Sequence, residues 1–126
     1  MIRVTAARTV RETTAPYEYT DENGETKTEQ IKVRYFVRTA KEAREWREEM
    51  VRRFEESKAN PDAPPFFVYH MDTLAERLES LPDLADEKGK AFPITSEALG
   101  MLSTRNLEAI HDAIEADTAP KEQPSK

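Results

Sequence analysis

Residues 31–38 read IKVRYFVR, and this stretch decides the fold. Its apolar side chains fall on odd-numbered positions: Ile31, Val33, Tyr35 and Val37. Alternation with a period of two is typical of a β-strand that has one buried face. The stretch therefore predicts a strand whose odd-numbered side chains pack against a core.

A turn and an earlier strand precede this stretch. Residues 21–24 read DENG, a strong turn signal, and the length of the loop sets the register of the hairpin. A two-residue loop would put Tyr17 and Tyr19 on the face opposite Ile31. A three-residue loop, with Gly24 in a left-handed bulge, returns both tyrosines to the buried face. We therefore predict the bulged hairpin, with these pairs: Tyr19 opposite Lys27, and Tyr17 opposite Glu29.

The start of the chain alternates in the same way. Its apolar side chains fall on even-numbered positions: Ile2, Val4, Ala6 and Val10. We therefore expect residues 1–38 to form an antiparallel β-hairpin or small sheet.

A helix follows the strand directly. Residues 39–42 read TAKE, in which Thr39 caps a helix and Glu42 reaches back to the cap. The helix is predicted to run to about residue 58. Its apolar side chains recur at spacings of three and four: Ala43, Trp46, Met50 and Phe54, with Val51 alongside. We expect Trp46 to be its buried anchor.

The middle of the chain begins with a break. Residues 60–65 read NPDAPP, and prolines lack the amide donor that a helix or central strand needs, so we predict a loop. Residues 66–69 read FFVY and fit a helix, a short strand or an apolar plug, of which we favour the helix. Asp72 is predicted to cap a short helix that ends at Pro82. One stripe of this helix would be apolar: Leu74, Leu78 and Leu81.

The last part of the chain predicts a loop and two more helices. Residues 83–92 are polar and read as the loop. Thr95 and Ser103 are predicted to cap the two helices. The apolar residue before each cap is expected to form a hydrophobic staple with a leucine in the helix: Ile94 with Leu99, and Leu102 with Leu107. The final helix has a buried stripe made of Leu107, Ile110 and Ile114.

Together these elements predict one α+β domain over residues 1–116. The β-hairpin or small sheet occupies 1–38, a helix occupies 39–58, and a helical part occupies 66–116, giving about four short-to-medium helices. Residues 117–126 lack apolar anchors and are predicted to be a disordered tail.

Composition and charge narrow the classes of function. The chain has 126 residues, no cysteine and a net charge of −6. Residues 1–60 carry 13 Lys and Arg against 12 Asp and Glu, whereas residues 61–126 carry 6 against 13. That acidity opposes nucleic-acid binding, which needs a positive surface, and favours protein partners. No apolar run reaches the roughly 18 to 20 residues that cross a bilayer, and no signal peptide is visible, so we expect no membrane association and a cytoplasmic location.

The sequence shows no cluster of catalytic, cofactor-binding or metal-binding residues. A metal site can be drawn from His70 with Asp72 and Glu76, but no histidine pair has helical zinc spacing, and His111 stands apart. No serine lies in a nucleophile elbow, and three glycines cannot build a phosphate loop. We expect no enzymatic activity, no cofactor and no metal.

One basic feature leaves a nucleic-acid alternative open. Positive side chains alternate along the predicted strand and continue on the helix: Lys32, Arg34, Arg38, Arg44, Arg47, Arg52 and Arg53. They would suit a single-strand-binding accessory. The interpretation we favour is an outward strand face protected against edge pairing, followed by helix ion pairs with interspersed glutamates.

Four segments, in this order, resemble one family of proteins: IKVRYFVRT at 31–39, LESLPDL at 78–84, ITSEAL at 94–99 and NLEAIHDAI at 106–114. The likeness spans roughly residues 25 to 115 and is to the small tail assembly chaperones of long-tailed bacteriophages. It implies a non-enzymatic protein that escorts the hydrophobic tape-measure protein while tail-tube subunits polymerise around it. Such a protein would act in the cytoplasm of the host cell.

The chain offers side chains for binding a protein partner. We predict a groove for an amphipathic helix from these residues: Met50, Phe66, Phe67, Tyr69, Met71, Leu74, Leu78 and Met101. Each of them also fits a place in the core. A second hypothesis is an adaptor or inhibitor that binds a host protein. The N-terminal hairpin could also support a homo-oligomer by edge pairing.

Overall fold

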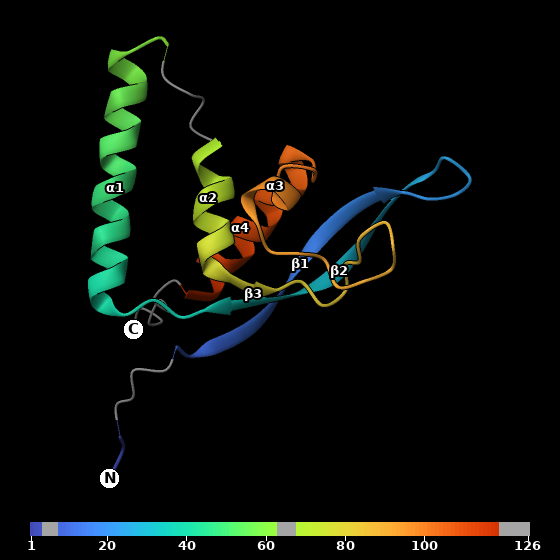
Figure 1. Cartoon of the computed structure of the whole chain (residues 1–126), viewed down its shortest axis with the longest axis horizontal. Helices are drawn as coiled ribbons and strands as arrows, with labels where there is room; N and C mark the ends of the chain where they lie inside the picture. The colour runs from blue at the N-terminus through green and yellow to red at the C-terminus, as the bar shows by residue number, and fades with distance from the viewer. Residues whose placement is uncertain (4–7, 63–67, 119–126) are drawn as a thin grey trace, which may run out of the picture.

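The protein is an α+β fold, as the sequence predicts, and in it a three-stranded antiparallel sheet carries helices on one face (Figure 1). The computed structural model describes residues 1–3, 8–62 and 68–118, without the side chains of 68–70. The described elements are, in chain order, β1 (Val10–Thr20), β2 (Thr26–Phe36), α1 (Ala40–Ala59), α2 (Val68–Arg77), β3 (Leu78–Ser80), α3 (Ser96–Leu99) and α4 (Thr104–Thr118).

The hairpin of β1 and β2 has the predicted register. Tyr17 lies opposite Glu29 and Tyr19 lies opposite Lys27, which confirms the three-residue bulged loop. Gly24 has a φ of 79° and its amide donates to the carbonyl of Asp21 at 3.0 Å. Because only glycine adopts that φ without strain, the Asn-Gly dipeptide fixes which side chains face the core.

The first strand is shorter than predicted. β1 begins at Val10, which pairs with Phe36 at the end of β2, whereas Ile2 lies outside any strand and is exposed. The prediction that the alternation from Ile2 marks a strand was wrong for that residue, because β2 ends at Phe36 and offers no further ladder positions. Val4 and Ala6 lie outside the described residues.

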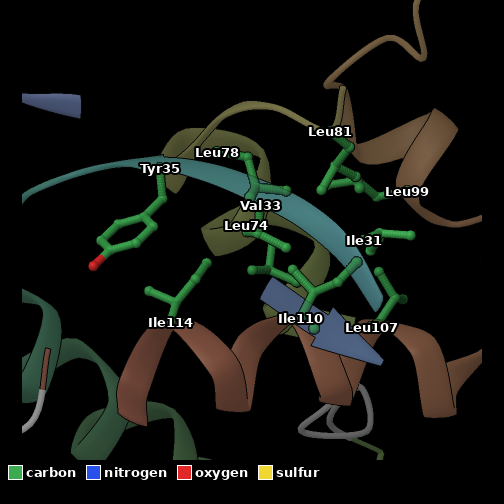
Figure 2. Close-up of a cluster of buried hydrophobic side chains, with 11 residues drawn as sticks. Ile31, Val33, Tyr35, Leu74, Leu78, Leu81, Leu99, Leu107, Ile110 and Ile114 are labelled. Carbon is green, nitrogen blue, oxygen red and sulfur yellow. The ribbon is translucent and has the colours of Figure 1, made fainter. Parts of the chain in front are cut away.

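The core lies between the sheet and the helices (Figure 2). β2 contributes Ile31, Val33 and Tyr35, whose side chains point towards Ile110 and Ile114 of α4. The other members of the cluster are Ala15, Leu74, Leu78, Leu81, Leu99 and Leu107. The hairpin and the helical half therefore share one core.

The segment after α2 differs from the prediction. α2 ends at Arg77, and Leu78–Ser80 forms a third strand that pairs with Arg34 and Tyr35 of β2. Asp72 lies inside α2, where its carboxylate accepts a hydrogen bond from the Ser96 hydroxyl at 2.7 Å, so it is not the helix cap. The strand wins over one more helical turn because it pairs exposed backbone groups of β2 and still buries Leu78.

The predicted caps are present. Thr39 and Glu42 form a complete capping box at the start of α1, and the Thr95 hydroxyl accepts from the amide of Ala98 at 3.1 Å. The Ser103 hydroxyl accepts from the amide of Asn106 at 3.2 Å at the start of α4. α4 continues to Thr118, two residues beyond the predicted domain end, and residues 119–126 lie outside the described part.

Side chains block further strand pairing at the β1 edge of the sheet and along the part of β2 that β3 does not cover. Asn106 on α4 is 4% exposed and binds the outward backbone of Glu18 on β1, accepting from its amide and donating to its carbonyl, each at 2.9 Å. On β2 the amide of Lys32 donates to the Asp83 carboxylate at 2.7 Å. Pro16 in β1 offers no amide at all. These features work against edge-to-edge self-association, which the hairpin alone suggested.

Candidate functional site

Helix α1 stands apart from the rest of the described structure (Figure 1). It spans 20 residues, yet none of its residues belongs to the buried core cluster, and Met50 is its one buried side chain. Trp46, predicted to be the buried anchor, is only partly buried. Its ring lies beneath the Arg38 guanidinium at 4.3 Å and 6.4 Å from the ring of His111 on α4. One side of the helix therefore carries exposed residues.

That side carries a regular stripe, which we call the outer stripe: Arg44, Arg47, Val51, Phe54 and Lys58. All five are exposed, Val51 at 58% and Phe54 at 47%. Their spacing of three, four, three and four residues is that of the contact positions in a coiled coil. The Lys58 ammonium lies 4.4 Å from the centre of the Phe54 ring. The outer stripe thus presents two apolar side chains flanked by three cations.

The opposite edge of α1 is held by ion pairs along the helix. Glu49 accepts from Arg52 and from Arg53, and Arg52 also reaches Glu56 at 3.1 Å. Hydrogen bonds from the two arginines lower the pKa of Glu49 to about 2. These pairs, with the capping box, support the helix without help from the core.

A cleft of about 550 Å³, which we call the arginine cleft, opens between the first half of α1 and the last turn of α4. Among the described residues its lining includes four arginines, Arg11, Arg38, Arg47 and Arg77, against one carboxylate, Glu115. The rest of the wall is mostly apolar: Val37, Ala43 and Trp46. Of the four, Arg11 forms an ion pair, with Asp117 at 3.7 Å.

Of the two inner arginines of this cleft, Arg77 is buried and Arg38 is half-buried. Arg77 is 6% exposed, donates to the Phe36 carbonyl at 2.8 Å and lies 5.4 Å from the centre of the Tyr35 ring. Burial, together with the nearby charge of Arg77, lowers the pKa of Arg38 to about 10. Burial also lowers the pKa of Arg77. Within the described ranges neither guanidinium forms an ion pair with a carboxylate.

The described members of the predicted groove do not form one exposed surface. Leu74 and Leu78 lie in the core, and the partly buried Met71 packs against it. Met101 lies just after α3, is 77% exposed, and lines a pocket together with Tyr17 and Phe92. The remaining predicted residues divide as follows: Met50 is buried on α1, Tyr69 lies in α2 without a described side chain, and Phe66 and Phe67 lie outside the described residues.

The basic residues of β2 and α1 are partly neutralised. Arg34 donates to Glu79 at 2.7 Å and lies 3.7 Å from Glu12, and Arg52 and Arg53 pair with glutamates of their own helix. Three of the cations along this strand and helix are thus paired with carboxylates, which weakens the positive surface that a single-strand binder needs.

The described residues hold no arrangement for metal capture. No group of three or more histidine, aspartate or glutamate side chains among them is close enough to bind an ion. His111 lies 3.6 Å from Asp112 and 3.9 Å from Glu115, and it packs near Trp46. The proposed site around His70 falls on a side chain that is not described. No helix in the described part is both long enough and apolar enough to cross a bilayer.

Comparison with known proteins finds no matching family model, no similar curated protein and no similar solved structure. The likeness to phage tail assembly chaperones therefore rests on the four sequence segments alone. Two features of the site were missed from the sequence. The first is that Val51 and Phe54 lie on a different side of α1 from Trp46, which their heptad spacing could have indicated. The second is that Arg38 and Arg77 lie together, which nothing in the sequence indicated.

Proposed function

We propose that this chain is a non-enzymatic protein-binding protein that docks a helical partner on the outer stripe of α1. The observation that carries the proposal is the exposure of Val51 and Phe54 at contact spacing on a helix outside the core. A fold of this size buries its large apolar side chains where it can. A helix that instead displays two of them between cations is suited to pairing with another helix.

The chemistry of the outer stripe indicates what kind of helix would bind. Arg44 and Arg47 form no ion pair within the described part of the chain, and Lys58 sits beside Phe54. A partner helix with apolar contact residues flanked by Asp or Glu would bury Val51 and Phe54 and pair the three cations. The occupant we propose is therefore an acidic amphipathic helix.

The helix α1 is ready for this role before the partner arrives. Its capping box and its Glu49 ion pairs form in the free chain, so binding need not order a disordered segment. Preorganisation of this kind lowers the entropic cost of association.

The resemblance to tail assembly chaperones suggests which protein supplies the helix. On that basis we propose that the partner is the tape-measure protein of a long-tailed phage, escorted in the cytoplasm of the host cell. The acidic second half of the chain would keep such a complex in solution. Of the alternatives, a nucleic-acid accessory is less well supported, because Arg34, Arg52 and Arg53 are ion-paired.

We expect a tape-measure gene beside the gene for this chain, and the test is co-expression with the protein that it encodes. We expect the wild-type chain to keep the partner soluble and to co-purify with it. The double variant V51S/F54S should lose the complex. The matched control is I2S/M101S, which also removes two exposed apolar side chains but away from α1, and it should retain the complex.

Two results would reject the proposal. If no tape-measure gene neighbours this one, or the partner stays insoluble with the wild-type chain, the chaperone role is wrong. If V51S/F54S binds as well as the wild type, the outer stripe is not the docking surface.

A further inference from the structure

The lining of the arginine cleft carries four arginines against one carboxylate, although Arg38 and Arg77 also border an adjoining cleft lined by Glu42, Glu45, Glu49 and Glu76. Buried charges in proteins are normally paired with an opposite charge, because removing a lone ion from water is costly. Here Arg77 is buried and Arg38 half-buried, and both line the same cleft. Glu42, Glu76 and Glu115 lie near enough to act on Arg38 only at longer range.

The Arg77 side chain links two elements of the fold through a hydrogen bond, whereas the Arg38 side chain forms no such link among the described residues. The Arg77 guanidinium binds the Phe36 carbonyl and so ties the end of α2 to the end of β2. Arg38 makes no hydrogen bond within the described ranges and lies over the Trp46 ring. The Arg38 guanidinium is therefore positioned by the Trp46 ring, and its N–H donors can still bind a ligand.

The walls around these arginines suit an organic ion. Val37, Ala43 and the Trp46 ring supply an apolar surface, and the buried Nε1 donor of Trp46 has no hydrogen-bond acceptor among the described residues. Arg47 adds a further cation at the mouth of the cleft. Guanidinium groups bind the oxygens of carboxylates and phosphates through paired hydrogen bonds.

We propose that the arginine cleft binds a small organic oxyanion, carboxylate or phosphate, whose charged group pairs with Arg38 beside Arg77 and whose body lies against Trp46. The volume of about 550 Å³ accommodates a small molecule. The proposal is independent of the partner helix, although Arg47 borders both the cleft and the outer stripe.

Trp46 provides the readout, because it is the one tryptophan in the chain. Its fluorescence is recorded during titration of the full chain with sodium pyrophosphate and, separately, with sodium citrate. Sodium chloride at the same ionic strength is the reference for simple screening. We expect a saturable change with at least one of the two anions, with a dissociation constant on the order of 1 mM or tighter. The anion that binds more tightly distinguishes phosphate from carboxylate recognition.

Two variants that each remove one positive charge test whether the fluorescence change comes from binding at Arg38. R38Q should weaken binding by about tenfold or more, because it removes the charge and the fork of donors. R44Q lies on α1 outside the cleft lining and should stay within about twofold of the wild type. R38K keeps the charge without the planar fork and should fall between them.

Stability supplies a second readout. Without anion, R38Q should be at least as resistant to heat as the wild type, since it removes a half-buried charge that forms no ion pair with a described carboxylate. With pyrophosphate or citrate, the melting temperature of the wild type should rise and that of R38Q should not. The proposal is overturned if neither anion gives a saturable signal above chloride, if R44Q weakens binding as much as R38Q, or if R38Q unfolds readily without anion.

Discussion

Replacing Asn106 by alanine should destabilise the protein more than any other single change to a polar side chain on α4. The Asn106 amide satisfies both outward backbone groups of Glu18, at 2.9 Å each, and is almost fully buried. Alanine leaves one donor and one acceptor of β1 without partners. Each costs about 1 to 2 kcal/mol, so the expected loss is about 2 to 4 kcal/mol. That is a large part of the roughly 5 to 15 kcal/mol that holds a domain together.

The assay is equilibrium unfolding in urea, followed by circular dichroism. The matched control is R105A, because Arg105 also contacts Glu18 but does so through an exposed ion pair of 2.9 Å with its carboxylate. R105A should cost no more than about 0.5 kcal/mol. N106A should also aggregate more readily, since it uncovers the β1 edge. A loss for N106A below about 0.5 kcal/mol, or no larger than that of R105A, would refute the reasoning.

Three further predictions concern the core and the titrating groups. In urea unfolding, I110A should lose about 2 to 5 kcal/mol and V51A no more than about 0.5 kcal/mol, because Ile110 is buried and Val51 is exposed; equal losses would place α1 in the core. Burial and a hydrogen bond to Asp117 raise the pKa of Tyr35 from 10.0 to about 12. The folded-state pKa is the higher one, so this stabilisation is complete below pH 10 and is lost as the pH rises towards 12. Y35F should therefore show a smaller fall in unfolding free energy over that range, and an unchanged fall would contradict the account. The pKa of Glu49 lies at about 2, below its ordinary 4.5, so its support of α1 is present above pH 4.5 and disappears as the pH falls towards 2. NMR titration of the Glu49 carboxyl should show that low midpoint, and a midpoint near 4.5 would mean that its ion pairs do not form in solution.

The sequence predicted the hairpin well because its information is local. The parity of the loop, together with the alternation that includes Ile31 and Val33, leaves one register in which Tyr17 shares the buried face. The caps at Thr39, Thr95 and Ser103 were predictable for the same reason, since each bonds within three residues of itself.

The third strand was not predictable in this way. Leu74, Leu78 and Leu81 have helical spacing, and a short strand of three residues carries no periodicity of its own. What makes Leu78–Ser80 a strand is the free edge of β2, more than forty residues earlier in the chain. A non-local partner of that kind overrides local spacing.

The site followed the same rule. The heptad spacing of Val51 and Phe54 was visible, but spacing does not say which apolar side of a helix the fold will cover. The arginine cleft depends on the ends of β2, α2 and α4 meeting, which brings Arg38 beside Arg77. No local sequence pattern predicts that these three ends lie together.

The account depends most on the outer stripe of α1 being where a partner helix binds. The direct measurement is to follow the backbone amide NMR signals of the full chain while an acidic amphipathic segment of the tape-measure protein is added. We predict that the largest shifts fall on Arg47, Val51 and Phe54 and that the strands stay unchanged. Shifts centred on Met101 and α3, with α1 unaffected, would contradict it.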